Sequence, residues 1–293
     1  MLEHIRVIDL CDGTSQFAGH ILARLGAEVI AVEPVEGVST RHSGPYVDDD
    51  PHLDFSLTHW AYNRGKKSVV LDIELEQDRE KFLRLIQSAD ILFEDCQPGY
   101  LESLGLSPLD LANTNPQIIH ASITPYGLTG PRSHWLGTDL TAAAGSSFLY
   151  ASGDADRAPL RIGVPHSFLH GAADAAAASL VALQERNRSG MGQHIDVSAQ
   201  ESLTIGFPQN VAPMENALPA DRMAGGIRIG GMEIPLLFPC LDGYAICVIL
   251  PGAAFAPFCH RLTDWLEEEG ASDENLRSID WVNIGVQLFA GEV

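Results

Sequence analysis

Short apolar runs alternate with helical segments through the first two hundred residues, and this alternation constrains the fold more than any other feature. Residues 17–25 and 76–88 have apolar side chains at helical spacing. The alternation predicts an α/β fold with a doubly wound, mainly parallel sheet covered on both faces. Ligands of such sheets bind at the carboxyl ends of the strands. The runs typical of buried strands are residues 5–10, 27–34, 67–73, 89–94, 117–124 and 194–198.

The texture of the chain changes after residue 139, where small residues become frequent. An alanine-rich segment over 171–183 predicts a helix that packs closely in the core. Later, two apolar runs within 234–250 flank Asp242-Gly243, a pattern typical of a hairpin, and a helix is expected over 253–268.

These patterns predict two domains joined by an irregular segment. Residues 208–231 contain prolines, glycines and polar residues without periodicity, which indicates a linker or glycine loop. We therefore expect a large Rossmann-like domain over 1–207 and the beginning of a smaller α+β domain over 232–293.

The composition of the chain indicates which kinds of binding partner and which cellular compartment to expect. The chain has 18 Lys+Arg against 39 Asp+Glu, a formal net charge of −21, which disfavours nucleic acid and anionic lipid surfaces. We find no signal peptide and no apolar stretch of membrane-spanning length. The five cysteines are scattered without CxxC spacing, which is typical of reduced thiols, so we predict a cytoplasmic protein.

A series of short motifs occurs in a fixed order along the chain. The motifs are VIDL from Val7, LGAEVIAVEP from Leu25, NRGKKSVVLDI from Asn63, ADILFEDCQPG ending at Gly99, SITPYGLTGP from Ser122, GTDL with Asp139, RIGVP from Arg161, SGMGQHIDVS from Ser189 and FPCLDGY from Phe238. Together they resemble family III CoA-transferases, the group of carnitine CoA-transferase, formyl-CoA transferase and alpha-methylacyl-CoA racemase. The resemblance implies a doubly wound large domain, a smaller domain and an interlocked homodimer. Family members continue beyond the point where this chain ends, which implies a fragment or truncated form.

The resemblance implies transfer of CoA between carboxylic acids, with acyl-CoA as substrate and no permanently bound cofactor. In the family an aspartate attacks the thioester and forms an acyl-enzyme anhydride. That aspartate follows a GVP motif, but residues 163–165 here are followed by His166, Ser167 and Phe168. Phe168 cannot act as a nucleophile. A local realignment would offer Asp174, about two helical turns further on, as a less favoured candidate. The alternative is an inactive CoA-binding or dimerisation copy that acts with a complete partner domain.

A second acid of the family matches Asp139, where formyl-CoA transferase carries a glutamate near the reacting carbonyl. The resemblance therefore implies a catalytic role for Asp139. An equally open alternative is that Asp139 caps a helix beginning at Leu140. Thr138 replaces a histidine of the racemase branch, so racemase activity is the least supported family chemistry.

The resemblance also implies a set of CoA-binding residues. Arg41 matches an arginine that approaches the nucleotide phosphates, a contact that suits a guanidinium. Its alternative role is to offset the acidic residues 48–50. Gln97 occupies a place where relatives often carry a cation, and glycine pairs at 225–226 and 230–231 could match a mobile loop. The predicted CoA-binding residues are Arg41, Asn63, Arg64, Lys66, Gln97 and Gly99.

A different class of enzyme would use a metal. His166, His170 and Asp174 are each four residues apart, so they would share one face of a helix and could ligate an ion. Histidines at this spacing are more often hydrogen-bonded structural residues. The family reading takes precedence, and it requires no metal.

Overall fold

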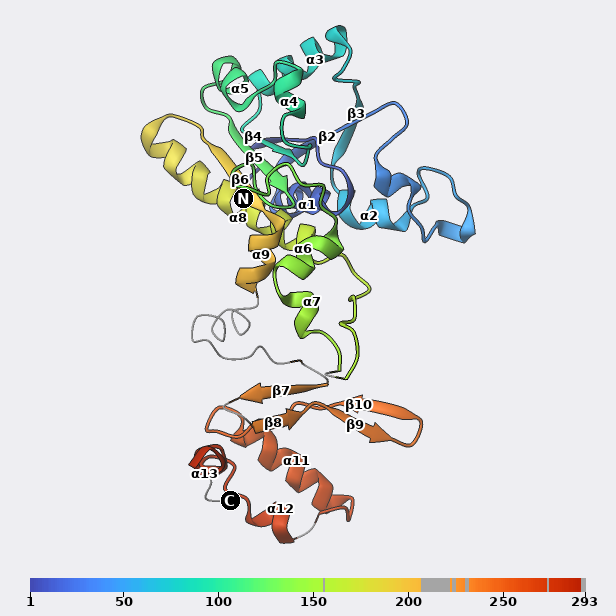
Figure 1. Ribbon diagram of the computed structural model, residues 1–293, viewed down its shortest axis with the longest axis vertical. Coiled ribbons are helices and arrows are strands. Elements are labelled where there is room, and N and C mark those ends of the chain that lie inside the picture. The colour runs from blue at the N-terminus through green and yellow to red at the C-terminus, as the bar shows by residue number, and fades with distance from the viewer. Residues whose placement is uncertain (155, 207–221, 223–224, 230–231, 273, 291–293) are drawn as a thin grey trace. The chain divides into compact units, whose positions relative to one another are not determined.

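The computed structural model describes residues 1–154, 156–206, 222, 225–229, 232–272 and 274–290. These residues form two compact units (Figure 1). The first holds residues 1–149 and 161–206, and the second holds 150–160 and the described residues from 222 onward. Most of the predicted 208–231 linker lies outside the described residues, so the predicted domain limits stay a prediction.

A six-stranded, fully parallel sheet forms the centre of the first unit, which confirms the predicted fold class. Its strand order is β3-β2-β1-β4-β5-β6. Ile8 on the central strand lies beside Ile30 of β2 and Leu92 of β4, which fixes the register. The strands are β1 (Arg6–Asp9), β2 (Glu28–Glu33), β3 (Lys67–Val70), β4 (Ile91–Glu94), β5 (Ile119–Thr124) and β6 (His194–Ser198).

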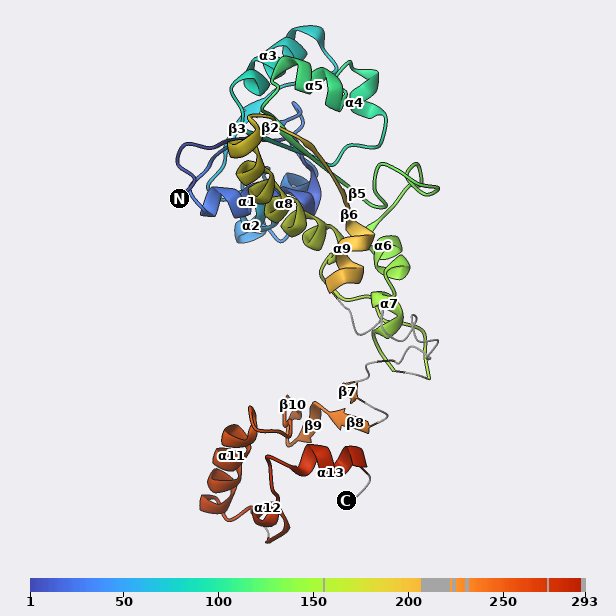
Figure 2. The same cartoon turned by 90° about the vertical axis from the view of Figure 1, so that its left-hand side faces the viewer.

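Helices cover both faces of this sheet (Figure 2). On one face, α1 (Phe17–Arg24) and α8 (Ser167–Ser189) pack on a core that contains Val7 and Phe93. On the other face, the core contains Ile8, Leu92 and Phe82. Successive residues of a strand point to opposite faces, so apolar runs such as residues 5–10 supply both cores at once. The helices of this second face are α3 (Glu76–Gln87), α4 (Tyr100–Ser103) and α5 (Pro108–Thr114).

The ends of these helices follow from local sequence. Ser107 and Asp110 form a capping box at the start of α5. The predicted alanine-rich helix is confirmed as part of α8, which ends at Gly190 in the left-handed conformation (φ 75°). The remaining helical segments are η1 (Gly13–Gln16), η2 (Ser39–His42), η3 (Val47–Asp49), α2 (Leu57–Asn63), α6 (Asp139–Gly145), α7 (Phe148–Ala151) and α9 (Ala199–Gly206).

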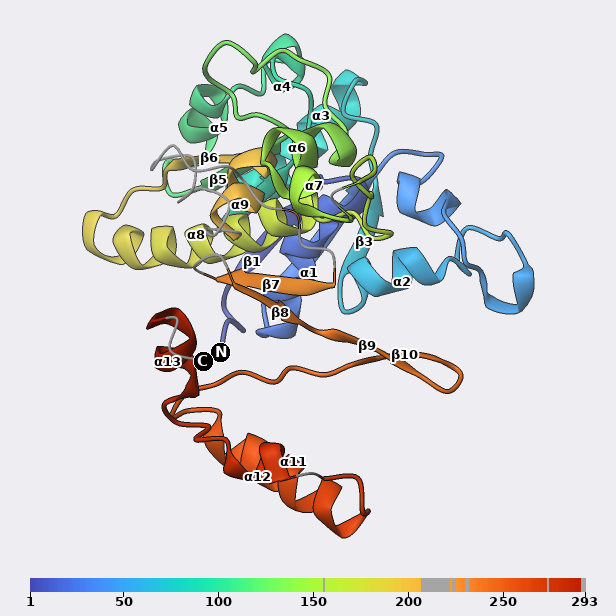
Figure 3. The ribbon, with the colours of Figure 1, turned by 60° about the horizontal axis from the view of Figure 1, so that its bottom comes forward.

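The second unit contains the predicted hairpin, in which β9 (Leu237–Cys240) and β10 (Gly243–Ile246) pair antiparallel (Figure 3). Its turn is Leu241-Asp242, one residue earlier than predicted. A second antiparallel pair was not predicted: β7 (Gly226–Ile229) lies within the segment expected to be a linker, and it pairs with β8 (Met232–Pro235). The helices of this unit are α11 (Ala256–Glu268), α12 (Glu274–Ser278) and α13 (Ile284–Ala290).

Gly192 lets the chain before edge strand β6 lie close to the backbone of residues 116–118. This close approach gives a test of the placement of β6. A Cβ added there would lie 1.9 Å from the carbonyl oxygen of Ile118, and the Gly192 N–H donates to the Pro116 oxygen (2.8 Å). We expect Gly192→Ala to lower the free energy of unfolding by about 1–3 kcal/mol, because the backbone of the strand must shift. Chemical denaturation measures this.

The matched control is Gly163→Ala, since a Cβ at Gly163 meets nothing within 4 Å. Its unfolding free energy should stay within about 0.5 kcal/mol of the parent. Equal effects of the two substitutions would contradict the placement of β6.

Candidate ligand-binding site

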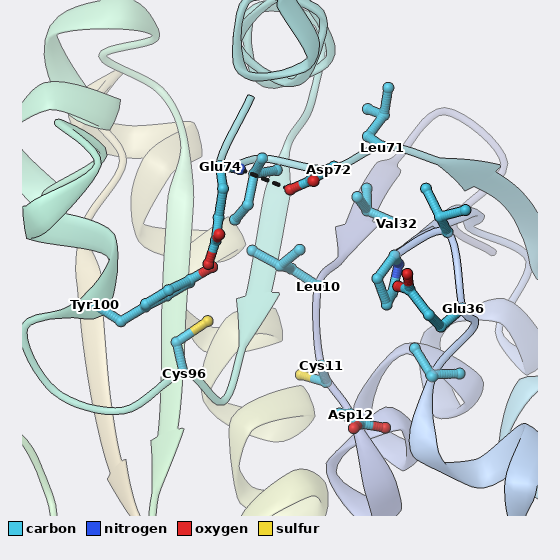
Figure 4. A pocket seen from close by; sticks show the side chains of 14 residues that line it. Leu10, Cys11, Asp12, Val32, Glu36, Leu71, Asp72, Glu74, Cys96 and Tyr100 are labelled. Carbon is cyan, nitrogen blue, oxygen red and sulfur yellow. Dashed lines mark hydrogen bonds between the residues drawn. The ribbon is translucent and has the colours of Figure 1, made fainter. Parts of the chain in front are cut away.

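A cavity of about 390 Å³ lies at the carboxyl ends of the central strands (Figure 4). The chain runs outward from β1 to β2 and β3 on one side, and to β4, β5 and β6 on the other. The gap between β1 and β4 is therefore the topological switch point, where sheets of this order bind ligands. The cavity is lined by Leu10, Cys11, Asp12, Val32, Pro34, Val35, Glu36, Val38, Leu71, Asp72, Ile73, Glu74, Cys96 and Tyr100.

This cavity combines apolar walls with four carboxylates, those of Asp12, Glu36, Asp72 and Glu74. The Tyr100 hydroxyl donates to Glu74 Oε1 (3.1 Å), and burial together with this neighbouring carboxylate raises the pKa of Tyr100 to about 12. Among its described lining residues there is no Lys or Arg. We call this space the switch-point cavity.

A backbone-to-side-chain hydrogen bond between Asp12 and Asp95 joins the segments that follow β1 and β4. The Asp12 N–H donates to Asp95 Oδ1 (2.9 Å), while Asp12 Oδ1 accepts from the Ser39 N–H (2.8 Å) and hydroxyl (2.7 Å). Burial raises the pKa of Asp95 to about 8, and the charges of Asp12 and Glu94 act in the same direction. The raised pKa favours the protonated form of Asp95, which limits repulsion where the two strands end.

The ammonium of Lys66 is held inside the protein. Its Nζ donates to Asp9 Oδ2 (2.6 Å), to the Gln16 carbonyl (2.6 Å) and to Asn63 Oδ1 (2.8 Å). Only 2% of the Lys66 side chain and 1% of the Asp9 side chain are exposed. An ammonium has three donors, so Lys66 is saturated by protein groups. Its predicted contact with CoA stays a prediction.

Arg41 contacts two carboxylates. Its guanidinium donates to Glu33 (Nη2 to Oε1, 2.9 Å) and to Asp54 (Nη1 to Oδ1, 2.9 Å). Burial would raise the pKa of Glu33, but hydrogen bonds from Arg41 and Ser68 outweigh it and hold the pKa at about 2. The alternative in which Arg41 offsets residues 48–50 is wrong, because its ion-pair partners are Glu33 and Asp54.

Four of the six predicted CoA-binding residues gather around a second cavity of about 700 Å³. Trp60, half-exposed, also lines it. The Arg64 side chain is exposed there, and within the described residues its guanidinium has no ion pair or hydrogen bond. We call this space the cationic cavity. The four predicted residues are Arg41, Asn63, Arg64 and Lys66.

The other two predicted CoA-binding residues lie elsewhere. Gln97 lines a small pocket with Cys96 and His120. Gly99 precedes α4 with φ 91°, a left-handed conformation that glycine adopts without strain. The structure therefore does not bring Gln97 and Gly99 into the cationic cavity.

Asp139 links two helices. Thr138 caps α6 by accepting from the Thr141 N–H, so the prediction that Asp139 is the cap of this helix is wrong. Instead, Asp139 Oδ1 accepts from the Ser167 N–H (2.8 Å) at the start of α8, and the Ser167 hydroxyl donates to the Asp139 carbonyl (3.1 Å). Phe168, the next residue, is half-buried against the sheet core.

The metal alternative gains no support from the geometry. The rings of His166 and His170 lie 6.2 Å apart between centroids, His166 also packs against Phe148 (5.4 Å), and Asp174 is exposed. Within the described ranges, no three His, Cys, Asp or Glu side chains are arranged to hold an ion. In the same ranges, no helix has the length and apolarity needed to cross a membrane.

Comparisons with known proteins agree with this architecture. The model of CoA-transferase family III matches residues 2–288, and the chain belongs to this family. It is 36% identical to the succinyl-CoA:(R)-benzylsuccinate CoA-transferase subunit BbsE of Thauera aromatica, covering 96% of this chain and 68% of the relative. It is 40% identical to the acetyl-CoA:oxalate CoA-transferase of Acetobacter aceti over 71% of this chain and 53% of that protein. The crystal structure of a CaiB/BaiF family protein from Brucella suis matches with a TM-score of 0.77 at 28% identity, covering 98% of this chain and 76% of that one.

Asp95 gives a pH-dependent test of the contact that joins the segments after β1 and β4. Its pKa rises from 3.8 to about 8 on folding, so the folded state binds the proton more tightly. Its contribution to stability is complete below about pH 4 and is lost as the pH rises towards 8. We expect Asp95→Asn, which resembles the protonated acid, to show a flatter fall of melting temperature across this range.

The control is Glu80→Gln, which removes an exposed acid on α3. Its melting temperature should follow the parent curve. An Asp95→Asn curve parallel to the parent would contradict the raised pKa.

Proposed function

We propose that this chain binds CoA or acyl-CoA through its first unit and takes part in CoA transfer between carboxylic acids. The observation that carries the proposal is the switch-point cavity within a chain of CoA-transferase family III. Apolar walls suit an adenine ring, and the carboxyl ends of parallel strands are where such sheets bind nucleotides. The matched relatives are named as CoA-transferases, which supports the same reaction class here.

The cationic cavity supplies the charge that a CoA diphosphate requires. The Arg64 guanidinium is exposed and has no partner among the described residues, so it can bind phosphate oxygens without breaking an existing contact. Arg41 already contacts Glu33 and Asp54, so phosphate binding there competes with two carboxylates. Arg64 is therefore the principal phosphate-binding residue of the proposal.

We infer further that the isolated chain does not form an acyl-enzyme anhydride. Phe168 occupies the expected place of the nucleophile and packs on the core, and the Asp139 carboxylate accepts the Ser167 N–H. A partner domain with the aspartate would complete the reaction, either in a tandem protein or in an interlocked dimer. The relative from Thauera aromatica is itself named as a subunit, which supports a shared site.

The location proposed for the protein is the cytoplasm. All five cysteines are free in the structure, which fits a reducing compartment.

Two measurements on the purified chain test the proposal. Calorimetric titration of CoA should show binding, and hydroxylamine added after succinyl-CoA should trap no modified carboxylate. Arg64→Ala should weaken CoA binding about tenfold, because a charge-assisted hydrogen bond is lost. Arg24→Ala, on the exposed end of α1, is the matched control and should bind like the parent.

The two measurements test separate parts of the proposal, the absence of a nucleophile and the identity of the ligand. A trapped carboxylate would overturn the inference about Phe168, and the modified residue would identify the nucleophile. Absence of CoA binding in the parent chain would overturn the proposed ligand.

A further inference from the structure

We propose that the cationic cavity binds a tetrahedral oxyanion, such as a phosphate group, and that His59 takes up a proton when the anion binds. The protonated ring then joins Arg64 as a second hydrogen-bond donor to the ligand. The inference rests on the part of the proposed function that places phosphate oxygens at Arg64. It adds a second binding residue and a dependence of that site on pH.

The position of His59 carries the first step. His59 lies on α2 and lines the cationic cavity, although only 8% of the residue is exposed. Its Nδ1 atom contacts two buried residues, at Thr40 Oγ1 (3.0 Å) and Asn63 Nδ2 (3.2 Å). Within the described residues, Nε2 has no hydrogen bond or ion pair, and it is not one of the fully buried atoms without a partner. Nε2 is therefore an unpartnered nitrogen that is open to solvent in the cavity wall.

A chain of hydrogen bonds fixes which nitrogen of the ring carries the hydrogen. The Lys66 ammonium can only donate, so its Asn63 partner is the oxygen Oδ1 (2.8 Å), and Asn63 Nδ2 is a donor. This nitrogen donates to Gln16 Oε1 (2.8 Å), which also accepts from the Thr40 hydroxyl (2.8 Å). Because that bond uses the single hydroxyl hydrogen, the Thr40 oxygen accepts from His59 Nδ1. The neutral ring is therefore the Nδ1–H tautomer, and Nε2 holds a lone pair.

The surroundings of His59 keep the ring neutral in the free chain. Burial lowers the pKa of His59, and the positive charge of Arg41 acts in the same direction. Lys66 also lowers the pKa, whereas the carboxylates of Glu33 and Asp54 raise it. The balance of these groups favours the unprotonated ring.

The other elements packed against α2 add little charge at the ring. Segment η1 has no charged residue, and α1 contributes His20, whose Nδ1 contacts the Arg64 carbonyl oxygen (3.0 Å). The Arg64 guanidinium is exposed and has no partner among the described residues. Arg64 and the Nε2 atom of His59 are therefore the two unpartnered groups that the cavity offers to an anion.

A bound oxyanion changes the preferred state of the ring. Neutral Nε2 and an anionic oxygen are both acceptors, so they form a hydrogen bond only when Nε2 is protonated. The negative charge favours the imidazolium, and Nε2–H donates to one oxygen while Arg64 donates to another. The proton comes from solvent, and no covalent bond forms. The affinity for the anion therefore rises as the pH falls, until His59 is protonated in the free chain as well.

Calorimetric titration of the full chain with sodium sulfate tests the inference, because sulfate stays a dianion across the neutral pH range. Comparison of the heats in two buffers of different ionisation enthalpy gives the number of protons taken up. We expect about 0.5–1 proton per bound sulfate near neutral pH. The affinity should rise by up to about tenfold for each unit by which the pH is lowered from about 8 to 6.

Three variants connect the effect to the cavity. His59→Gln keeps an amide that can donate to sulfate but does not titrate, so sulfate should bind without proton uptake. Arg64→Ala should weaken sulfate binding about tenfold, because a charge-assisted hydrogen bond is lost. The matched control is His4→Gln, which removes an exposed histidine outside the cavity and should keep the proton uptake of the parent.

Nitrogen-15 NMR of the histidine rings gives a readout that needs no variant. At constant neutral pH, addition of sulfate to the parent chain should convert one neutral Nδ1–H ring to an imidazolium. If every histidine ring keeps its protonation state at saturating sulfate, the inference is wrong.

The outcomes separate this inference from the proposed function. Sulfate binding without proton uptake, or unchanged uptake in His59→Gln, overturns the role of His59. Absence of sulfate binding overturns the oxyanion site. In each of these cases, binding of CoA by the parent chain leaves the proposed function in place. Sulfate binding with proton uptake but without CoA binding supports the oxyanion site and overturns the proposed ligand.

Discussion

The buried ion pair between Lys66 and Asp9 holds together the segments that build both cavities. Asp9 ends β1, and Lys66 follows α2, so the pair joins the central strand to a segment far away in the sequence. The same ammonium also holds the Gln16 carbonyl at the end of η1. Removing one partner of such a pair leaves a buried charge and costs about 3–5 kcal/mol. Lys66 belongs to a motif that the family resemblance assigns to CoA binding, but in this structure it joins segments of the protein to one another. We call the Lys66–Asp9 pair the internal clamp.

Helix α1 packs so closely against the Lys66–Asp9 pair that it has no room for a side chain at Gly19. A Cβ at Gly19 would lie 2.2 Å from Asp9 Oδ2, so only glycine lets α1 approach the carboxylate this closely. Asn63 supports the clamp because its amide donates to Gln16 Oε1 (2.8 Å). The clamp leaves Arg64 as the exposed cation beside it. The electrostatic division of the first unit, acidic at the switch point and cationic beside α2, follows from this arrangement.

Most of the fold could be predicted from sequence because buried parallel strands leave continuous apolar runs, as residues 5–10 and 117–124 do. The grouping of Arg41, Asn63 and Arg64 was also predictable, since they fall in recognisable motifs. The contacts of Lys66 with Asp9, Gln16 and Asn63 could not be predicted. A sequence motif does not show which hydrogen-bond donors already have partners inside the protein. The β7–β8 pair was missed although Ile227-Arg228-Ile229 and Met232-Glu233-Ile234 alternate apolar and polar residues on either side of a Gly-Gly dipeptide, a pattern typical of a hairpin. The prolines and glycines of the surrounding segment favoured a linker instead.

The acidic residues at the ends of β1 and β4 could have been used to predict an acidic site, but the sequence analysis did not use them. Asp12 and Asp95 directly follow the apolar runs of β1 and β4, and the carboxyl ends of parallel strands meet at one edge of the sheet. Adjacent strand ends that both carry acids therefore indicate an acidic site. Glu36 and Tyr100 were harder to find, because they reach the cavity from a loop and a short helix whose paths the sequence pattern does not fix.

Amide hydrogen exchange of the full chain, with and without CoA, tests most directly whether the carboxyl end of the sheet is the ligand site. The account predicts that the ligand slows exchange in residues 10–16, 34–38, 71–74 and 96–100, which surround the switch-point cavity or continue from its walls. Slowed exchange confined to residues 126–132 and 198–204, which contribute to a separate pocket, would contradict it.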